Sequence, residues 1–176
     1  RWGNGKVKVI KTGKNYDEAA AAAVVFQNET GAIFIHPFDD PNTIAGQGTI
    51  ALEVAQQMNE IGQKVNMFVG PVGGGGLMGG NSTYNRARYP DIEHVATESN
   101  EANAMTESIR KDRIVTLDRV SSLIESTAVL KPGEIPFELF RRNGVRMHNV
   151  PQDRVCSTWH DMNRIEGDTV ELAGAM

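Results

Sequence analysis

The feature of this sequence with the clearest chemistry is a run of four glycines followed by a leucine: Gly73, Gly74, Gly75, Gly76 and Leu77. The run lies between a predicted strand at residues 65–69 and a predicted helix that begins at Leu77. Each glycine costs backbone entropy on folding, and two normally suffice for a turn. Consecutive N–H groups at the start of a helix form a cradle for a phosphate group. We therefore expect these five residues to bind a phosphate.

The identity of that phosphate has more than one interpretation. A nucleotide-binding P-loop is excluded, because no Gly-Lys-Ser/Thr follows the glycines. The spacing Gly74-x-Gly76-x-x-Gly79 fits a dinucleotide-binding fingerprint, and Glu98 stands where a ribose-binding acid is expected. An NAD-binding module therefore remains an alternative, although a glycine-rich run matches this pattern almost automatically. A bare turn in a non-catalytic remnant of a fold is the third interpretation.

Other residue types with chemical potential have simpler explanations. The adjacent Asp39 and Asp40 rarely share one proton in a loop before a proline, so we interpret them as turn formers. His36, at the end of a predicted strand, is more simply a hydrogen-bonded structural histidine than a cleft residue. Cys156 is the only cysteine, which excludes an intrachain disulfide and a cysteine-cluster zinc site. We expect no metal site.

Several further segments accompany the glycine run. They are His36-Pro37-Phe38-Asp39-Asp40-Pro41, Ile44-Ala45-Gly46-Gln47-Gly48-Thr49, Ala102-Asn103-Ala104-Met105 and Lys131-Pro132-Gly133-Glu134-Ile135-Pro136-Phe137. With these motifs the sequence resembles the serine/threonine dehydratases, most closely their biosynthetic threonine branch, from about residue 7 to residue 176. Serine racemases share the same loops and are close relatives.

The resemblance implies a fold, a cofactor and an activity. The fold would be the type II fold of pyridoxal-phosphate enzymes, like the tryptophan-synthase β-subunit, and residues 73–77 would bind the cofactor phosphate. The implied reaction converts L-threonine (or L-serine) to 2-oxobutanoate (or pyruvate) and ammonia, in isoleucine biosynthesis. The family is typically homo-oligomeric.

The family's Schiff-base lysine segment has no counterpart here. The sequence contains seven lysines, Lys6, Lys8, Lys11, Lys14, Lys64, Lys111 and Lys131, and none has the Ser-x-Lys context of that segment. We interpret all seven as solvated surface residues. The resemblance therefore implies an internal piece of the catalytic domain, with no catalytic residue assigned and no activity of the chain alone.

The match also departs from the family pattern at specific residues. Ser126 replaces a family glycine in Glu125-Ser126-Thr127-Ala128-Val129. Glu98 and Ala102 match a cation site of the serine racemases, but Ala104 stands where that site has an acid. The resemblance therefore implies that Ser126 crowds the cofactor pocket, and the alanine at position 104 argues against a metal at the cation site.

The periodicity of apolar residues predicts the elements that position the glycine run. We expect strands at residues 6–10, 32–35, 65–69, 94–97 and 145–150, and helices at 15–31, 49–61, 77–89, 101–110 and 151–165. Asn15 and Glu18 predict a capping box for the first helix, which Gly31 ends. The fold class is α/β: an open, mostly parallel sheet with helices on both faces, here incomplete. Residues 1–41 would be a βαβ unit of a small lobe, and 42–176 part of a large cofactor-binding lobe.

Composition and charge indicate which classes of binding partner the chain lacks. The chain has 176 residues, 18 lysines and arginines against 22 aspartates and glutamates, and a net charge of −4. This balance argues against a nucleic-acid partner or an anionic membrane surface. No apolar run approaches the ~18 residues of a membrane span. We expect a small amino acid as the binding partner and a cytoplasmic protein, or an organellar one in a eukaryote.

Overall fold

The computed structural model describes residues 5–176. Its internal contacts divide the chain into two units, the first ending at Phe34 and the second comprising Ile35–Met176. Each unit is described by itself.

The first unit contains one helix among its described residues, α1 (Tyr16–Thr30). Asn15 Oδ1 accepts a hydrogen bond from the Glu18 N–H at 2.9 Å, and Gly31 ends the helix with a φ of 70°. The Glu18 carboxylate accepts from the N–H of Lys14 at 2.8 Å, one residue earlier than a standard capping box. The predicted helix and both of its ends are confirmed.

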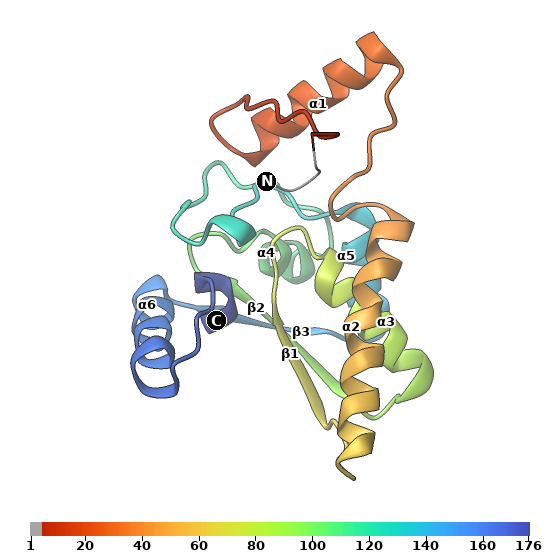
Figure 1. Ribbon diagram of the computed structural model, residues 1–176, viewed down its shortest axis with the longest axis vertical. Coiled ribbons are helices and arrows are strands. Elements are labelled where there is room, and N and C mark those ends of the chain that lie inside the picture. Colours follow the sequence, from red (N-terminus) through yellow and green to blue (C-terminus); the bar gives the residue numbers. More distant parts are fainter. Residues whose placement is uncertain (1–4) are drawn as a thin grey trace. The chain divides into compact units, whose positions relative to one another are not determined.

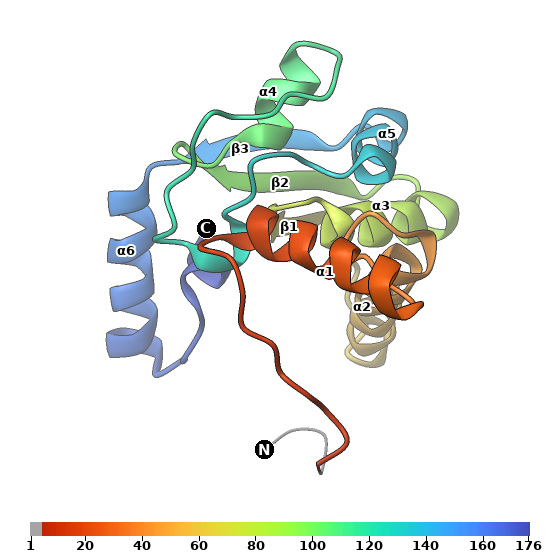
Figure 2. The same ribbon diagram turned by 90° about the horizontal axis from the view of Figure 1, so that it is seen from above.

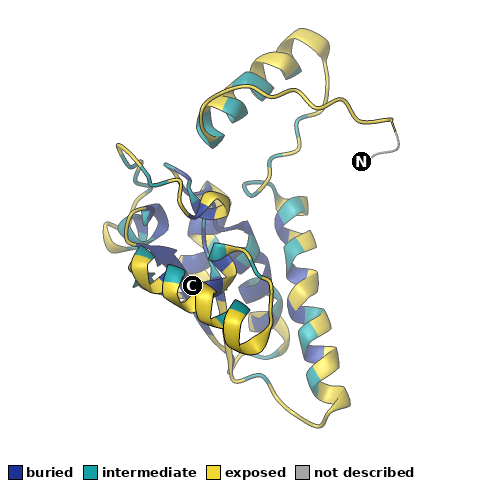
Figure 3. Cartoon of the chain, turned by 60° about the vertical axis from the view of Figure 1, so that its left-hand side comes forward, coloured by how far each residue is buried: buried dark blue, intermediate teal, exposed yellow. Residues whose placement is uncertain are grey.

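The two strands predicted around α1 do not form. Residues 6–10 and 32–35 carry no strand pairing, and their apolar side chains other than half-buried Phe34 are exposed, with Val9 at 76% and Ile33 at 90%. Helix α1 itself has no buried residue (Figure 3). Alternation of apolar residues indicates a segment that is able to form a β-strand, but a strand also needs a neighbouring strand with which to form hydrogen bonds. Without one, the predicted βαβ unit is wrong as local structure.

The second unit is built on a parallel sheet. Within the described residues it has three strands, β1 (Met67–Pro71), β2 (Glu93–Ser99) and β3 (Arg146–Val150), in the order β1-β2-β3. Val69 pairs with Val95, and Val95 with Arg146. Figure 2 shows β2 between its two neighbours. The predicted α/β class with a parallel sheet is confirmed, and all three strands of this unit lie where the sequence predicts them.

Helices connect and cover these strands (Figure 1). They are α2 (Pro41–Glu60), α3 (Gly76–Arg88), α4 (Ala104–Arg110), α5 (Glu134–Asn143) and α6 (Gln152–Asp161). Short 3₁₀ turns occur at Glu125–Thr127 and Leu172–Ala175, and a π turn at Met162–Glu166. In the described residues, no helix is long and apolar enough to cross a membrane.

Helix α2 begins at Pro41, eight residues before the predicted start at Thr49, so the predicted start of this helix is wrong. The Asp40 side chain accepts hydrogen bonds from the N–H groups at positions 42 and 43, and Pro41 fits the first turn. Gly48 is a contact residue inside the helix, since a Cβ there would lie 3.1 Å from the Gly80 carbonyl oxygen of α3. Gly48 and Gly80 thus allow α2 and α3 to approach closely.

Two groups of buried apolar residues hold the second unit together. The larger joins β1, β2, α3, α4 and α5 and includes Val72, Met78, Ala96, Met105, Phe137, Phe140 and Val145. The smaller joins α6 to the 3₁₀ turns and includes Ile124, Val155, Ala173 and Ala175. Val72 and Met78 of the larger core lie on either side of the glycine run in the sequence, so the run is anchored to this core at both ends.

Candidate functional site

The glycine run connects the carboxyl end of β1 to the amino end of α3. Val72 continues the sheet pairing, donating its N–H to the Thr97 carbonyl oxygen at 2.8 Å. Gly75 is the N-cap of α3 and has a φ of 96°, a backbone conformation that disfavours any residue with a Cβ. The predicted strand–glycine–helix order is therefore confirmed.

Each glycine of the run packs closely against another segment of the unit. A Cβ at Gly73 would lie 3.0 Å from Thr127 Cα, and one at Gly76 would lie 3.0 Å from Phe38 Cα. The aromatic ring of Phe38 occupies the space where a Cβ of Gly74 would go. At Gly75, a Cβ would lie 2.7 Å from atoms of Met105 and Pro136. A side chain at any of these four positions would require its neighbours to move, which explains a run longer than a turn requires.

The start of α3 offers N–H groups without acceptors inside the helix. The first backbone bond of the helix runs from the Gly79 N–H to the Gly75 carbonyl oxygen at 2.9 Å, so the amides of the first turn have no intrahelical partner. Because the N-cap is a glycine, no side chain accepts from them either, in contrast to α1 and α2. The helix dipole adds a partial positive charge at this end. These properties fit a phosphate group, and half-buried Leu77 lies in the same turn.

The two neighbouring aspartates do not form a pair of catalytic carboxylates. Asp40 caps α2, as described above, whereas the Asp39 carboxylate accepts hydrogen bonds from the N–H groups of Glu134 and Ile135 at the start of α5, at 3.0 and 2.9 Å. The Nδ1 atom of His36 accepts from the Asp39 N–H at 2.8 Å. All three side chains are therefore structural, as expected, but capping helices is a more specific role than forming a turn.

Glu98, the residue on which the dinucleotide interpretation depends, is fully buried. Its two carboxylate oxygens accept from the N–H groups of Met105 and Thr106 at 2.9 and 2.8 Å, so it caps α4. Burial raises the pKa of this carboxyl to about 7, against the opposing effect of its hydrogen bonds from Thr106 and Met105. A carboxyl occupied in this way cannot receive a ribose hydroxyl, and the dinucleotide interpretation loses its acidic partner.

The seven lysines all lie on the surface of the molecule. Lys131 pairs with Glu134 at 3.1 Å, and Lys111 with Glu107 at 3.5 Å. A lysine that acts as a nucleophile needs a desolvated or electropositive site that favours its neutral form. None of these exposed residues has such a site. Among the described residues there is also no group of three or more histidine, cysteine, aspartate or glutamate side chains that could hold a metal.

Sequence reasoning missed the part that α5 and Phe38 play at the glycine run. The segment 131–137 was noted only as a motif, although Gly133-Glu134-Ile135-Pro136 carries a helix-start signal, with an acid and a proline in the first turn. The Gly133 N–H donates to the Gly74 carbonyl oxygen at 3.0 Å. That link, between residues 59 positions apart, has no signal in the local pattern.

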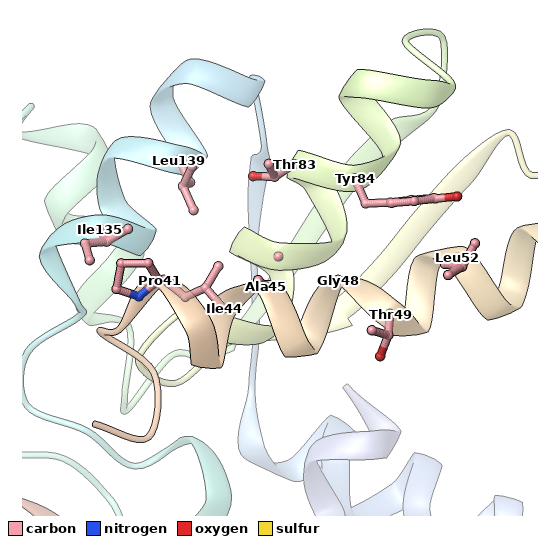
Figure 4. A pocket seen from close by; sticks show the side chains of 11 residues that line it. Pro41, Ile44, Ala45, Gly48, Thr49, Leu52, Thr83, Tyr84, Ile135 and Leu139 are labelled. Carbon is pink, nitrogen blue, oxygen red and sulfur yellow. The ribbon is translucent and has the colours of Figure 1, made fainter. Parts of the chain in front are cut away.

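A separate cavity of about 410 Å³ lies between α2, α3 and α5 (Figure 4). Its lining is mostly apolar, with Ile44, Leu52 and Leu139 among the side chains, and Thr49, Thr83 and Tyr84 are the lining residues that carry a hydroxyl group. No carboxylate, imidazole or ammonium group belongs to the lining. The cavity offers space but no acid–base chemistry.

Comparison with known proteins identifies relatives along nearly the whole chain. An L-threonine ammonia-lyase of Geobacter sulfurreducens is 43% identical over 134 residues, which are 76% of this chain and 32% of that protein. A biosynthetic L-threonine dehydratase of Corynebacterium glutamicum is 34% identical over 97% of this chain and 39% of its own length. The chain thus spans between about a third and two fifths of these relatives.

Solved structures give the same result. The processed form of threonine deaminase isoform 2 from Solanum lycopersicum matches with a TM-score of 0.84 and 31% identity, over 95% of this chain and 45% of that chain. Maize serine racemase matches with a TM-score of 0.86 and 26% identity, over 96% and 50%. The family model described as "Pyridoxal-phosphate dependent enzyme" matches residues 2–176. This chain therefore belongs to the family of pyridoxal-phosphate dependent enzymes.

Proposed function

We propose that this chain is part of an enzyme that deaminates L-threonine, or L-serine, to 2-oxobutanoate, or pyruvate, and ammonia. The single observation that carries the proposal is the amino end of α3, where a glycine N-cap and side-chain-free neighbours leave the N–H groups of the first turn open to an anion. The relatives named threonine ammonia-lyase and threonine dehydratase support the choice of reaction. Isoleucine biosynthesis follows from the same relatives.

In this proposal Gly73, Gly74, Gly75, Gly76 and Leu77 hold the phosphate of pyridoxal phosphate. When bound, this cofactor supplies the electron sink for breaking a bond at the substrate's Cα. The role of the chain is to orient the cofactor: the amides of α3 fix its phosphate, and the packing around the glycines keeps the cradle in one shape. No lysine here is assigned as the Schiff-base partner, because all seven are exposed. We therefore expect the isolated chain to lack deaminase activity.

The division into lobes is also part of the proposal. Residues 1–41 would belong to the smaller lobe of the enzyme and residues 42–176 to the larger, cofactor-binding lobe. The internal contacts of the chain divide it into two units between Phe34 and Ile35, a few residues before the proposed lobe boundary at residue 41, and this division supports the proposal of two lobes. We also propose a homo-oligomeric enzyme in the cytoplasm, as is typical of the family.

Amino-acid racemisation is the second candidate function. It is the weaker candidate, because maize serine racemase is 26% identical to this chain and the threonine deaminase of Solanum lycopersicum is 31% identical over a similar share of it. Both reactions begin with the loss of the Cα proton and use the same phosphate site. Formation of D-serine rather than pyruvate by the complete enzyme would distinguish them.

The proposal is tested through the phosphate site itself. Binding of pyridoxal phosphate to the purified chain is followed by tryptophan fluorescence in the wild type, Leu77→Asp and Leu77→Asn. An aspartate in the first turn of a helix favours the helix but repels a bound phosphate, whereas asparagine has the same size without the charge. We expect Leu77→Asp to weaken binding by at least about tenfold relative to Leu77→Asn. Equal affinities of the two variants would contradict the phosphate assignment.

A further inference from the structure

Asp39 connects two segments that are far apart in sequence and that both touch the glycine run. Its Oδ2 accepts from the Glu134 N–H at 3.0 Å and its Oδ1 from the Ile135 N–H at 2.9 Å, across 95 and 96 residues. Figure 4 shows Pro41 and Ile135, from the starts of α2 and α5, side by side. A half-buried carboxylate thus fastens the amino end of α5 to the segment that precedes α2.

The start of α5 in turn fixes the glycine run from one side. The Gly133 N–H donates to the Gly74 carbonyl oxygen at 3.0 Å, which orients the peptide group between Gly74 and Gly75. Pro136, in the first turn of α5, lies against Gly75 so closely that a Cβ there would be 2.7 Å from it. A shift of the first turn of α5 would therefore move both the carbonyl group and the backbone that shape the cradle.

Phe38, the residue immediately before Asp39, fixes the run from the other side. Its ring fills the space beside Gly74, and its backbone lies 3.0 Å from where a Cβ of Gly76 would be. The glycine run is consequently held between Phe38 and the start of α5. The carboxylate of Asp39 joins these two supports directly.

We infer that Asp39 is a positioning residue for cofactor binding: it holds the start of α5 against the glycine run and thereby sets the geometry of the N–H groups that receive the phosphate. The inference rests on the proposed function of residues 73–77. A carboxylate suits this role because two charge-assisted hydrogen bonds at a helix amino end are stronger than neutral ones and favour one orientation.

Asp40 provides a matched control within the same loop. It too accepts two backbone N–H bonds at a helix amino end, from Asn42 at 2.8 Å and Thr43 at 2.9 Å. These bonds stay within its own segment and reach neither α5 nor the glycine run. Asp40→Ala therefore removes a helix cap of the same kind but leaves the contacts of Phe38 and of the start of α5 with the glycine run in place.

The test measures binding of pyridoxine 5′-phosphate, which has the ring and phosphate of the cofactor but no aldehyde and so cannot react with surface lysines. Affinity is determined by calorimetry for the wild type, Asp39→Ala, Asp39→Asn and Asp40→Ala, with phosphate-free pyridoxine as the reference ligand. We expect Asp39→Ala to bind the phosphate about tenfold more weakly, Asp39→Asn to restore part of the affinity through its remaining carbonyl oxygen, and Asp40→Ala to stay within about twofold of the wild type. The affinity for pyridoxine should be equal in all four proteins.

A second readout needs no ligand. The N–H groups of Gly133 and Gly79 donate to the carbonyl oxygens of Gly74 and Gly75, and their amide hydrogen exchange should be faster in Asp39→Ala than in the wild type and unchanged in Asp40→Ala. Wild-type affinity together with unchanged exchange in Asp39→Ala would overturn the inference while leaving the phosphate site intact. If the wild type itself bound no pyridoxine 5′-phosphate, the proposed function would fail, and exchange alone would decide whether Asp39 positions the run. Should Asp39→Ala not fold, Asp39→Asn decides by the same two measurements, with a smaller expected effect.

Discussion

Replacing Gly75 with alanine tests directly whether the glycine run is dictated by its surroundings. This residue has a φ of 96°, and the new methyl group would lie 2.7 Å from Met105 Cε and 2.7 Å from Pro136 Cβ. Contacts this short require a neighbour to move, and one of these neighbours is the rigid ring of a proline in the first turn of α5. We therefore expect a clear loss of stability.

The magnitude has two parts. A residue with a Cβ at positive φ costs roughly 1–2 kcal/mol, and crowding a packed site costs roughly 1–3 kcal/mol more. The sum for Gly75→Ala is about 2–5 kcal/mol. Gly62, after the end of α2, separates the two parts, because it has a φ of 68° and a Cβ there would meet no atom within 4 Å. Gly62→Ala should cost only the first part, roughly 1–2 kcal/mol.

The assay is urea-induced unfolding of the wild type and both variants, followed by circular dichroism. The reasoning predicts that the Gly75 variant loses roughly 1–3 kcal/mol more free energy of unfolding than the Gly62 variant. Equal losses would refute it, because the cost would then come from the backbone angle alone and the packing around Gly75 would not matter.

Three further predictions concern residues outside the glycine run. Burial raises the pKa of Glu98 to about 7 from its ordinary value of 4.5, so the folded chain keeps a proton that the unfolded chain releases. The proton on Glu98 therefore stabilises the fold fully below pH 4.5, and this contribution of about 3 kcal/mol is lost as the pH rises through 7. In a series of unfolding curves, Glu98→Gln should remove this loss of stability between pH 4.5 and 7. A pH profile equal to that of the wild type would contradict the burial argument. Arg86 donates to the carbonyl oxygens of Asn143 at 2.6 Å and Pro90 at 2.9 Å, and Arg86→Ala should lower the free energy of unfolding by about 1–2 kcal/mol; a change near zero would show that water replaces both bonds. Ile33 is 90% exposed, so Ile33→Ser should change stability by less than about 0.5 kcal/mol and reduce self-association in light scattering. Strong destabilisation by this variant would mean that the isoleucine is buried in solution.

Local sequence signals were sufficient where the structure depends on local contacts. Asn15 and Gly31 mark the two ends of α1, and the strands that became β1, β2 and β3 lie within a few residues of their predicted places. The glycine run was found because its composition is costly in any ordinary element. Its placement between β1 and α3 followed from the same periodicity.

Local signals failed where distant residues decide the outcome. Residues 6–10 and 32–35 have the pattern of strands but no partner strand among residues 5–176. Gly48 lies before the predicted helix start, and its place inside α2 depends on a contact with Gly80, 32 residues away. Glu98 matched a ribose-binding acid by spacing alone, whereas its carboxylate caps α4. The link from Asp39 to α5 spans 95 residues, and nothing in the separate segments indicates it.

The most direct test of the account is a nuclear magnetic resonance titration of the ¹⁵N-labelled chain with pyridoxine 5′-phosphate. Binding at the amino end of α3 predicts saturable shifts that are largest for the amides of residues 73–77, with smaller changes at Gly133 and Phe38, which contact the run. Saturable shifts centred elsewhere, or no shifts in a folded chain, would contradict the assignment of the glycine run as the site that holds the cofactor phosphate.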